Sequence, residues 1–232
     1  MARQTAGTTG GSPDIERLGE DGLLVRLGMA IDPRINARVH ALARQLAASR
    51  PDWVRDIVPA YASLAVFVEP GTPSHGCDPL DAAIDWIRAQ PTDLVADTVD
   101  PSVVEIPVRY GGEDGPDLAA VAAHAGLDPA DVISRHAAVD YTVAMLGFAP
   151  GFPYLLGLDP SLAMQRLQTP RLRVPAGSVG IGGAQTGIYP RSGPGGWRII
   201  GRTETVLFDP RHSQPSLLSP GDRVRFVPVA GP

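Results

Sequence analysis

The chain has 232 residues, a hydrophobic fraction of 44% and a formal net charge of −5, values typical of a globular protein with one large domain or two small ones. No apolar run approaches the roughly 20 residues that a membrane-spanning helix needs, and the N-terminus lacks the apolar core of a signal peptide, so we expect a cytoplasmic protein without a membrane partner. All 20 basic residues are arginine, which excludes a phosphate-loop lysine, a Schiff-base lysine and a lysine general base within the chain.

Charge is unevenly distributed along the chain. Residues 1–139 carry 11 arginines and 20 acidic residues, whereas residues 140–232 carry 9 arginines and 5 acidic residues. This division favours two modules, the second of which meets an anion or an acidic partner surface. The second module is only mildly basic and has no recognised nucleic-acid-binding motif, so we expect no nucleic-acid partner.

Cysteine and histidine usage argues against several kinds of site. The single cysteine, Cys77, excludes an intrachain disulfide and a multi-cysteine metal site. Its Gly/Pro-rich surroundings favour a turn residue over a nucleophile. The histidines other than His136 have no partner at metal-ligand spacing, so we predict no metal site.

The first module is predicted for residues 14–91, after a tail (residues 1–13) that we expect to be disordered. Its two helices are signalled by Asp32-Pro33 and Asp78-Pro79, because Asp is a good N-cap and Pro suits the first helical position. Apolar and β-branched runs predict strands at 23–27, 53–58 and 63–68. The order of elements, ββαββα, fits a small α/β sandwich.

The second module is predicted for residues 103–232, after a linker at 92–102. It opens with a strand at 103–110, and Pro107 predicts a sheet edge or a strand start there. Two helices are predicted at 117–125 and 129–138, the latter capped by Asp128. Short apolar runs broken by Gly and Pro then predict strands at 141–146, 179–182, 187–189, 197–200, 206–208 and 223–229. So many short strands indicate a closed or nearly closed β-barrel in an α+β protein.

The segment from Met145 to Arg202 is the candidate functional region, because nine glycines between Gly177 and Gly201 accompany many aromatic and polar side chains. The run Gly180–Gly187 lacks the spacing and the following helix of a dinucleotide fingerprint. Its backbone N–H groups could cradle an oxyanion, and Gln185 could orient a small amide. The alternative is that these glycines form tight barrel turns.

Several side chains are candidates for binding or catalysis. His136 combines a near-neutral reference pKa with a place on a predicted helix, so it is either a proton-transfer group or a core histidine. Arg171 and Arg173 lie on the same side of an extended segment, so they form either a clamp for a carboxylate or phosphate or a solvated face. The remaining groove candidates are Phe148, Phe152, Tyr154, Tyr189, Trp197 and Arg202. Ser178 and Ser192 lack a base and an elbow motif, so no complete nucleophile–base set emerges.

Several long stretches, in order, resemble one known family. They are VEIPVRYGGEDGPDL (103–117), HAAVDYTVAMLGFAPGFPYL (136–155), TPRLRVPAGSVGIGGAQTGIYP (169–190), PGGWRIIGRT (194–203) and PGDRVRFVPV (220–229). The chain resembles the KipI family, which is the family of the 5-oxoprolinase B subunits and is also called allophanate hydrolase subunit 1. It departs from the family pattern at Gly193, where the family commonly has Ser before PGGW, and at Gly19-Glu20, where Gly-Asp is common.

The resemblance implies a C-terminal cyclophilin-like β-barrel and a homologous second subunit of the KipA type, which corresponds to the 5-oxoprolinase C subunits. One implied function is a subunit of an ATP-dependent 5-oxoprolinase, in which a third, lactam-handling subunit takes part and ATP with Mg²⁺ is used by the complex. The implied alternatives are a KipI-like inhibitor of a histidine kinase and a subunit of an allophanate- or urea-degrading amidohydrolase.

The leading hypothesis is the 5-oxoprolinase subunit. His136, Arg171, Gln185 and Arg202 are its expected catalytic residues. We expect the lactam to be activated by phosphoryl transfer and the ring to open on a partner subunit. Arginines would offset the phosphate charge in the absence of lysine, and Mg²⁺ would be held by partner or substrate oxygens.

Overall fold

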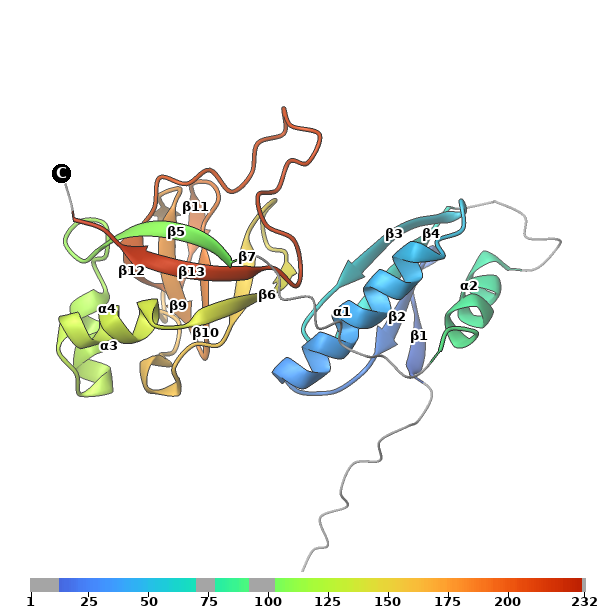
Figure 1. Cartoon of the computed structure of the whole chain (residues 1–232), viewed down its shortest axis with the longest axis horizontal. Coiled ribbons are helices and arrows are strands. Elements are labelled where there is room, and N and C mark those ends of the chain that lie inside the picture. The colour runs from blue at the N-terminus through green and yellow to red at the C-terminus, as the bar shows by residue number, and fades with distance from the viewer. Residues whose placement is uncertain (1–12, 70–77, 92–102, 231–232) are drawn as a thin grey trace, which may run out of the picture. The chain divides into compact units, whose positions relative to one another are not determined.

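The computed structural model describes residues 13–69, 78–91 and 103–230 (Figure 1). The first twelve residues of the predicted tail, the predicted linker and Cys77 lie outside these ranges. The described residues form two compact units, one on each side of residue 98 in the sequence.

The N-terminal unit is a four-stranded antiparallel sheet with two helices packed on it. Its strands, in the order β1-β2-β4-β3, are β1 Asp14–Leu18, β2 Gly22–Arg26, β4 Ser63–Val68 and β3 Val54–Pro59. Its helices are α1 Pro33–Ala48 and α2 Pro79–Arg88. This arrangement confirms the ββαββα order. Both helices begin as predicted, because the Asp32 and Asp78 carboxylates accept hydrogen bonds from the backbone N–H groups two residues on, at 2.7 and 2.9 Å.

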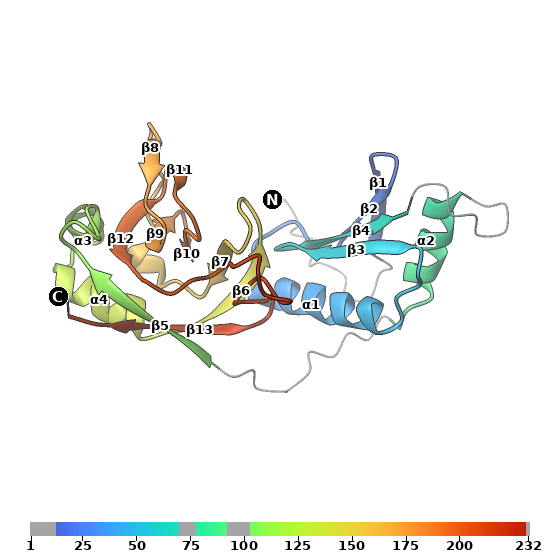
Figure 2. The same ribbon diagram turned by 90° about the horizontal axis from the view of Figure 1, so that it is seen from above.

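The C-terminal unit is a closed seven-stranded β-barrel with two helices and a small additional sheet. The barrel order is β10-β7-β6-β13-β5-β12-β9. Its strands are β5 Val103–Tyr110, β6 Asp140–Leu146, β7 Pro153–Leu156, β9 Ser178–Gly182, β10 Gln185–Ile188, β12 Arg198–Arg202 and β13 Arg223–Pro228. The helices are α3 Leu118–Ala125, α4 Pro129–Ala137 and the short 3-10 helix η1 Pro160–Leu162. The barrel confirms the predicted fold class. Figure 2 shows the remaining pair, β8 Arg171–Val174 and β11 Gly193–Gly195, on the side of the barrel away from β5 and β13.

Two strand predictions were wrong. Residues 206–208 form no strand, only an isolated bridge from Phe208 to Ser216, because a barrel already closed through β12 and β9 offers them no edge. Pro107 does not mark an edge, since β5 lies between β12 and β13. The Val108 carbonyl accepts a hydrogen bond from the Val229 backbone N–H, so the backbone polar groups of Val108 face β13. Those of its neighbour Pro107 face the opposite side, toward β12. There, β12 pairs only with Arg109 and Tyr110. The missing N–H of Pro107 therefore costs no ladder hydrogen bond.

Asp117 ties three elements of the barrel unit together. Its buried carboxylate accepts the Ile199 backbone N–H at 2.6 Å and the Arg171 guanidinium at 2.8 Å. Its own N–H donates to the Ile199 carbonyl at 2.8 Å. One side chain thus joins the start of α3 to β12 and to the β8–β11 pair.

We predict that Asp117→Ala lowers the free energy of unfolding by about 2–4 kcal/mol, because it removes the acceptor of a buried N–H and leaves Arg171 without its carboxylate. Chemical denaturation measures this loss. Asp140→Ala is the matched control, since Asp140 pairs with Arg225 at 2.7 Å on the surface and should cost about 1 kcal/mol or less. Equal losses in the two variants would contradict the structural role of Asp117.

Candidate functional site

The glycines of β9 and β10 lie on the outer face of these strands. Val179, Ile181 and Ile188 fill the barrel interior, so their neighbours in sequence point outward. A Cβ at Gly182 would lie 2.5 Å from the Trp197 ring, and one at Gly187 would lie 3.1 Å from the Phe152 ring. These glycines are therefore not a phosphate loop. They leave a bare sheet surface against which the Trp197 and Phe152 rings pack.

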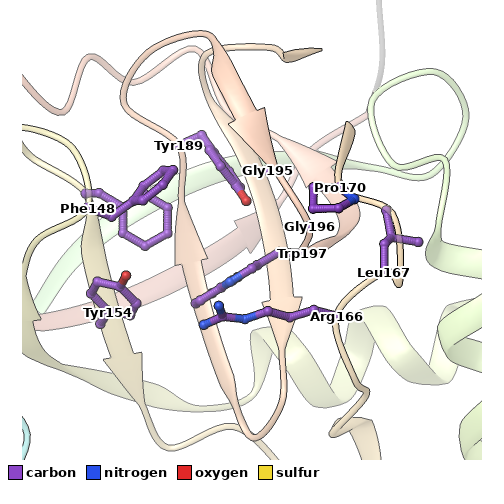
Figure 3. A pocket seen from close by; sticks show the side chains of 10 residues that line it. Phe148, Tyr154, Arg166, Leu167, Pro170, Tyr189, Gly195, Gly196 and Trp197 are labelled. Atoms are coloured by element: carbon purple, nitrogen blue, oxygen red, sulfur yellow. The ribbon is translucent and has the colours of Figure 1, made fainter. Parts of the chain in front are cut away.

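The rings on this surface form a compact cluster. Phe152 is at its centre, with ring centroids 4.9 Å from Tyr154, 5.2 Å from Tyr189 and 5.5 Å from Trp197. The contacts with Tyr189 and Trp197 are edge-to-face, the geometry that aromatic quadrupoles favour. Phe152 and Tyr189 are buried, and the hydroxyl end of Tyr189 points toward Gly195 (Figure 3).

A pocket of about 150 Å³ opens on the cluster (Figure 3). Its lining residues are Phe148, Phe152, Tyr154, Arg166, Leu167, Pro170, Tyr189, Gly195, Gly196 and Trp197. The lining contains one cation and no acidic residue. Burial raises the pKa of the Tyr154 and Tyr189 hydroxyls, so both are neutral hydrogen-bonding groups at neutral pH. The pocket therefore suits a neutral or anionic ligand with an apolar or ring-shaped body.

Phe148 forms one wall of the pocket from a strained turn. Its φ is 65°, a value that a residue with a large side chain rarely adopts. The Ala149 N–H donates to the Gly147 carbonyl at 2.7 Å, which is the i to i+2 hydrogen bond of a tight γ-turn. The Phe148 ring is 65% exposed and stands edge-on to Phe152 at 5.4 Å. Strain that holds an exposed ring at a pocket is typical of functional sites.

Arg166 supplies the charge of the pocket. Its guanidinium lies 5.6 Å from the centroid of the Trp197 ring, within cation–π distance. It is exposed and forms no ion pair with any residue in the described ranges. Sequence reasoning missed it because no motif surrounds it. One signal was present: residues 160–203 contain six arginines and no acidic residue.

The structure brings together five of the predicted groove residues. They are Phe148, Phe152, Tyr154, Tyr189 and Trp197. Gln185 is next to them but does not line the pocket. It is 8% exposed, and its pairing with Gly182 directs its side chain to the face that carries Trp197.

The predicted arginines do not line the pocket, and each has its own partner. Arg171 is held by Asp117, and the Arg173 Nε donates to the Ser192 hydroxyl at 3.2 Å. Arg202 donates to the Ala176 carbonyl at 3.0 Å and lines no part of the pocket. Within the described chain, the two guanidinium groups of the expected carboxylate clamp thus bind different acceptors.

His136 lies inside the barrel, on the opposite face of the sheet from the pocket. Its Nε2 is 2.9 Å from the Thr186 hydroxyl, and its Nδ1 is 2.8 Å from the Tyr110 hydroxyl. Thr186 donates its own proton to the Gly180 carbonyl, so Thr186 accepts from Nε2–H and Tyr110 donates to Nδ1. Complete burial lowers the pKa of His136 to about 3. The structure thus differs from the expected near-neutral proton-transfer group and gives a neutral core histidine.

The burial of His136 has a consequence for stability at acid pH. The pKa of His136 is about 3 in the folded chain and about 6.5 in the unfolded chain. The unfolded state therefore binds the extra proton first, so the stability that His136 contributes is complete above about pH 6.5 and is lost as the pH falls toward 3.

We predict that the wild-type chain loses about 2 kcal/mol more stability than His136→Gln between pH 7 and pH 5, from about 1.4 kcal/mol per pH unit below pH 6.5. Denaturant titrations at the two pH values measure the difference. His124→Gln is the control, because His124 is exposed on α3 and its replacement should keep the wild-type pH dependence. Identical pH profiles for wild type and His136→Gln would show that His136 does not titrate on unfolding.

The described residues contain no group of three or more His, Cys, Asp or Glu side chains that could hold a metal ion. Among the described helices, none has the length and apolar character required to cross a membrane. Ser178 is buried, and Ser192 is the acceptor of Arg173. The lining of the pocket therefore offers no nucleophile paired with a base.

Comparison with known proteins identifies relatives that match over most of the chain. The family model of the carboxyltransferase domain, subdomain C and D, matches residues 13–218. The chain is 41% identical to the 5-oxoprolinase B subunit of Bacillus subtilis (strain 168) over 222 residues, 93% of this chain and 92% of that protein. It is 44% identical to the 5-oxoprolinase B subunit of Escherichia coli O157:H7 over 91% of this chain and 94% of that protein.

Longer solved chains share the fold. This chain spans 40% of the protein TTHA0988, with a TM-score of 0.76 and 39% identity over 91% of its own length. It spans 22% of the urea carboxylase of Kluyveromyces lactis, with a TM-score of 0.71 over 94% of its own length. The 22% identity to that enzyme shows a common fold alone. Because the family model and the B subunits both match over most of its length, the chain belongs to the family of the carboxyltransferase domain, subdomain C and D, and is a relative of the 5-oxoprolinase B subunits.

Proposed function

We propose that the chain is a non-autonomous subunit of a heteromeric, ATP-dependent 5-oxoprolinase, which opens the lactam of 5-oxoproline to give glutamate. The observation that carries the proposal is the pairing of near-full-length similarity to proteins named as B subunits of 5-oxoprolinase with a ring-sized pocket that lacks a nucleophile and a base. A subunit that binds the substrate and leaves the chemistry to a partner has these properties.

The pocket would bind the substrate through its ring. The faces and edges of Phe148, Phe152 and Trp197 contact an apolar ring body, and the hydroxyls of Tyr154 and Tyr189 are the nearest polar groups for a lactam. Both hydroxyls stay protonated because burial raises their pKa, so they donate to a carbonyl oxygen without becoming charged. Ring opening would require a base and a water held by another subunit.

The aromatic pocket and the glycines beneath it do not fit a nucleotide. The glycines of β9 and β10 face aromatic rings, the chain has no lysine, and the pocket of about 150 Å³ holds one ring and no more. We therefore assign ATP and Mg²⁺ to a partner subunit. ATP would supply the free energy of opening by phosphoryl transfer to the lactam oxygen. The net reaction consumes one water for the lactam and one for ATP, and it yields glutamate, ADP and phosphate.

Two partners follow from this assignment. One is a homologous second subunit of the KipA type, equivalent to a 5-oxoprolinase C subunit, and the other is a subunit that handles the lactam. The stretch 160–203, with six arginines and no acidic residue, favours an acidic surface on the partner that meets this side of the barrel.

A urea-related activity is the second candidate. The observation that favours it is 38% identity over 87 residues to the urea amidolyase of Lachancea kluyveri. The 5-oxoprolinase reading has the stronger support, because the B subunits match at 41% and 44% identity over almost their full lengths.

We predict that the chain alone releases no glutamate from 5-oxoproline, and that the chain purified with its second and lactam-handling subunits releases glutamate only when ATP is present. Coupled glutamate detection measures this. The control is the same mixture without this chain. No release with all components and ATP present would reject the proposal, and tight binding to a histidine kinase would then favour a KipI-like inhibitor.

We predict that Phe148→Gly lowers turnover of 5-oxoproline by the assembled complex about tenfold while the free energy of unfolding changes by about 1 kcal/mol or less. Glycine relieves the positive-φ strain, which offsets the lost ring contacts. Phe148→Ala keeps the Cβ that this backbone disfavours, so it should be the less stable variant.

Leu172→Ala is the matched control for Phe148. Leu172 is 95% exposed on β8 and does not line the pocket, so its truncation should change neither turnover nor stability. Wild-type turnover in Phe148→Gly would show that this ring has no part in the reaction.

A further inference from the structure

The size of the pocket limits what it binds. Its volume is about 150 Å³, and an apolar cavity of about that size admits one benzene-sized ring. Five aromatic side chains surround this space, and Gly195 and Gly196 bring bare backbone to its edge. A Cβ at Gly195 would collide with the Tyr189 hydroxyl, so the glycine is needed for the tyrosine to stand where it does. The pocket is thus shaped for one compact ring.

The charge of the pocket selects among ring compounds. The lining has no carboxylate that could hold a cationic ligand, and the nearest acidic residues in the sequence are Asp159 and Glu204. Asp159 is paired with Arg135, and Glu204 with Arg109. Arg171, which follows the lining residue Pro170, is paired with Asp117. Arg166 is therefore the charged side chain of the lining, and no carboxylate in the lining opposes it.

Arg166 is oriented toward the ring site. Figure 3 shows its side chain running beside Trp197 toward Tyr154. Its positive charge acts on both tyrosine hydroxyls and opposes the rise of their pKa values that burial causes. Its Cζ lies 5.6 Å from the centroid of the Trp197 ring. Because no described residue pairs with its guanidinium, the N–H groups are available to an oxygen pair.

We propose that Arg166 is the carboxylate anchor of a subsite for a compact ring acid, with Trp197 as the residue that positions it. The ring occupies the aromatic pocket, and its carboxylate binds the guanidinium edge. The chemical class is a five- or six-membered ring that carries one carboxylate and no free amine. The identification of that ring with 5-oxoproline rests on the proposed function. The anchor itself does not.

The test uses the full chain with 5-fluorotryptophan incorporated, observed by fluorine NMR alone and in the complex with its partner subunits. The chain has three tryptophans, and Trp53→Phe and Trp86→Phe assign the two that lie in the N-terminal unit. The probes are 5-oxoproline, pyrrolidinone (the same ring without the carboxylate) and acetate (the carboxylate without the ring).

We expect 5-oxoproline to shift the Trp197 resonance with an affinity at least about tenfold higher than that of pyrrolidinone or acetate, because only it fills the pocket and reaches Arg166. Arg166→Gln should weaken 5-oxoproline about tenfold or more and leave pyrrolidinone unchanged. Arg166→Lys should recover part of the loss, since it keeps the charge without the planar fork. Arg38→Gln, which removes an exposed arginine of α1, should have no effect.

Equal affinities for 5-oxoproline and pyrrolidinone, unchanged binding in Arg166→Gln, or no shift of Trp197 in either the chain or the complex would overturn the anchor. The proposed function fails on a different measurement. If a complex that carries Arg166→Gln releases glutamate with an unaltered KM, the anchor is rejected and the oxoprolinase proposal stands. If the wild-type complex releases no glutamate but ring carboxylates still shift its Trp197 resonance, the oxoprolinase proposal is rejected and the anchor stands.

Discussion

The contact between the Trp197 ring and the bare backbone of Gly182 is the constraint on which the site depends. A Cβ at Gly182 would lie 2.5 Å from that ring, closer than any side chain permits. With the ring displaced, Phe152 would lose its edge-to-face neighbour, and Arg166 would lose the surface on which it stacks. The glycines matter because they have no side chain. Side chains at these outward positions of the sheet would hold the rings away from its backbone.

The strands β9 and β10 therefore contribute to both the barrel core and the aromatic cluster. Their inward side chains complete the barrel core, in which Thr186 bonds the neutral ring of His136. Their outward positions are the floor of the aromatic cluster. Because alternate residues of a strand point to opposite faces, the chemistry of one face is set independently of the other. This separation explains why the titratable histidine and the candidate site lie near each other in sequence and do not meet.

Asp117 connects this floor to the walls of the pocket. By binding both the Ile199 backbone and Arg171, it holds β12, which carries Trp197 at its entry, against the β8–β11 pair, which brings Gly195 to the pocket. The resulting pocket is lined by aromatic rings and one arginine, and its lining contributes no base or nucleophile. A barrel of this kind suits a binding subunit in an assembly where another chain supplies phosphoryl transfer and water.

The sequence by itself determined the features whose causes are local. The Asp-Pro pairs specify where α1 and α2 begin, because the capping hydrogen bond spans two residues, and the dense Gly and aromatic composition of residues 145–202 indicates a binding surface. The short strands β7 and β11 escaped prediction because Gly- and Pro-rich segments have no hydrophobic period. Only the tertiary structure decided that Pro107 faces an unpaired side of β5, that His136 is buried and neutral, and that Arg166 rather than Arg171 lines the pocket. Each of these depends on a partner far away in the chain, such as Trp197 for Arg166 and Asp117 for Arg171, and a sequence pattern carries no record of which distant side chains the closure of a barrel brings into contact.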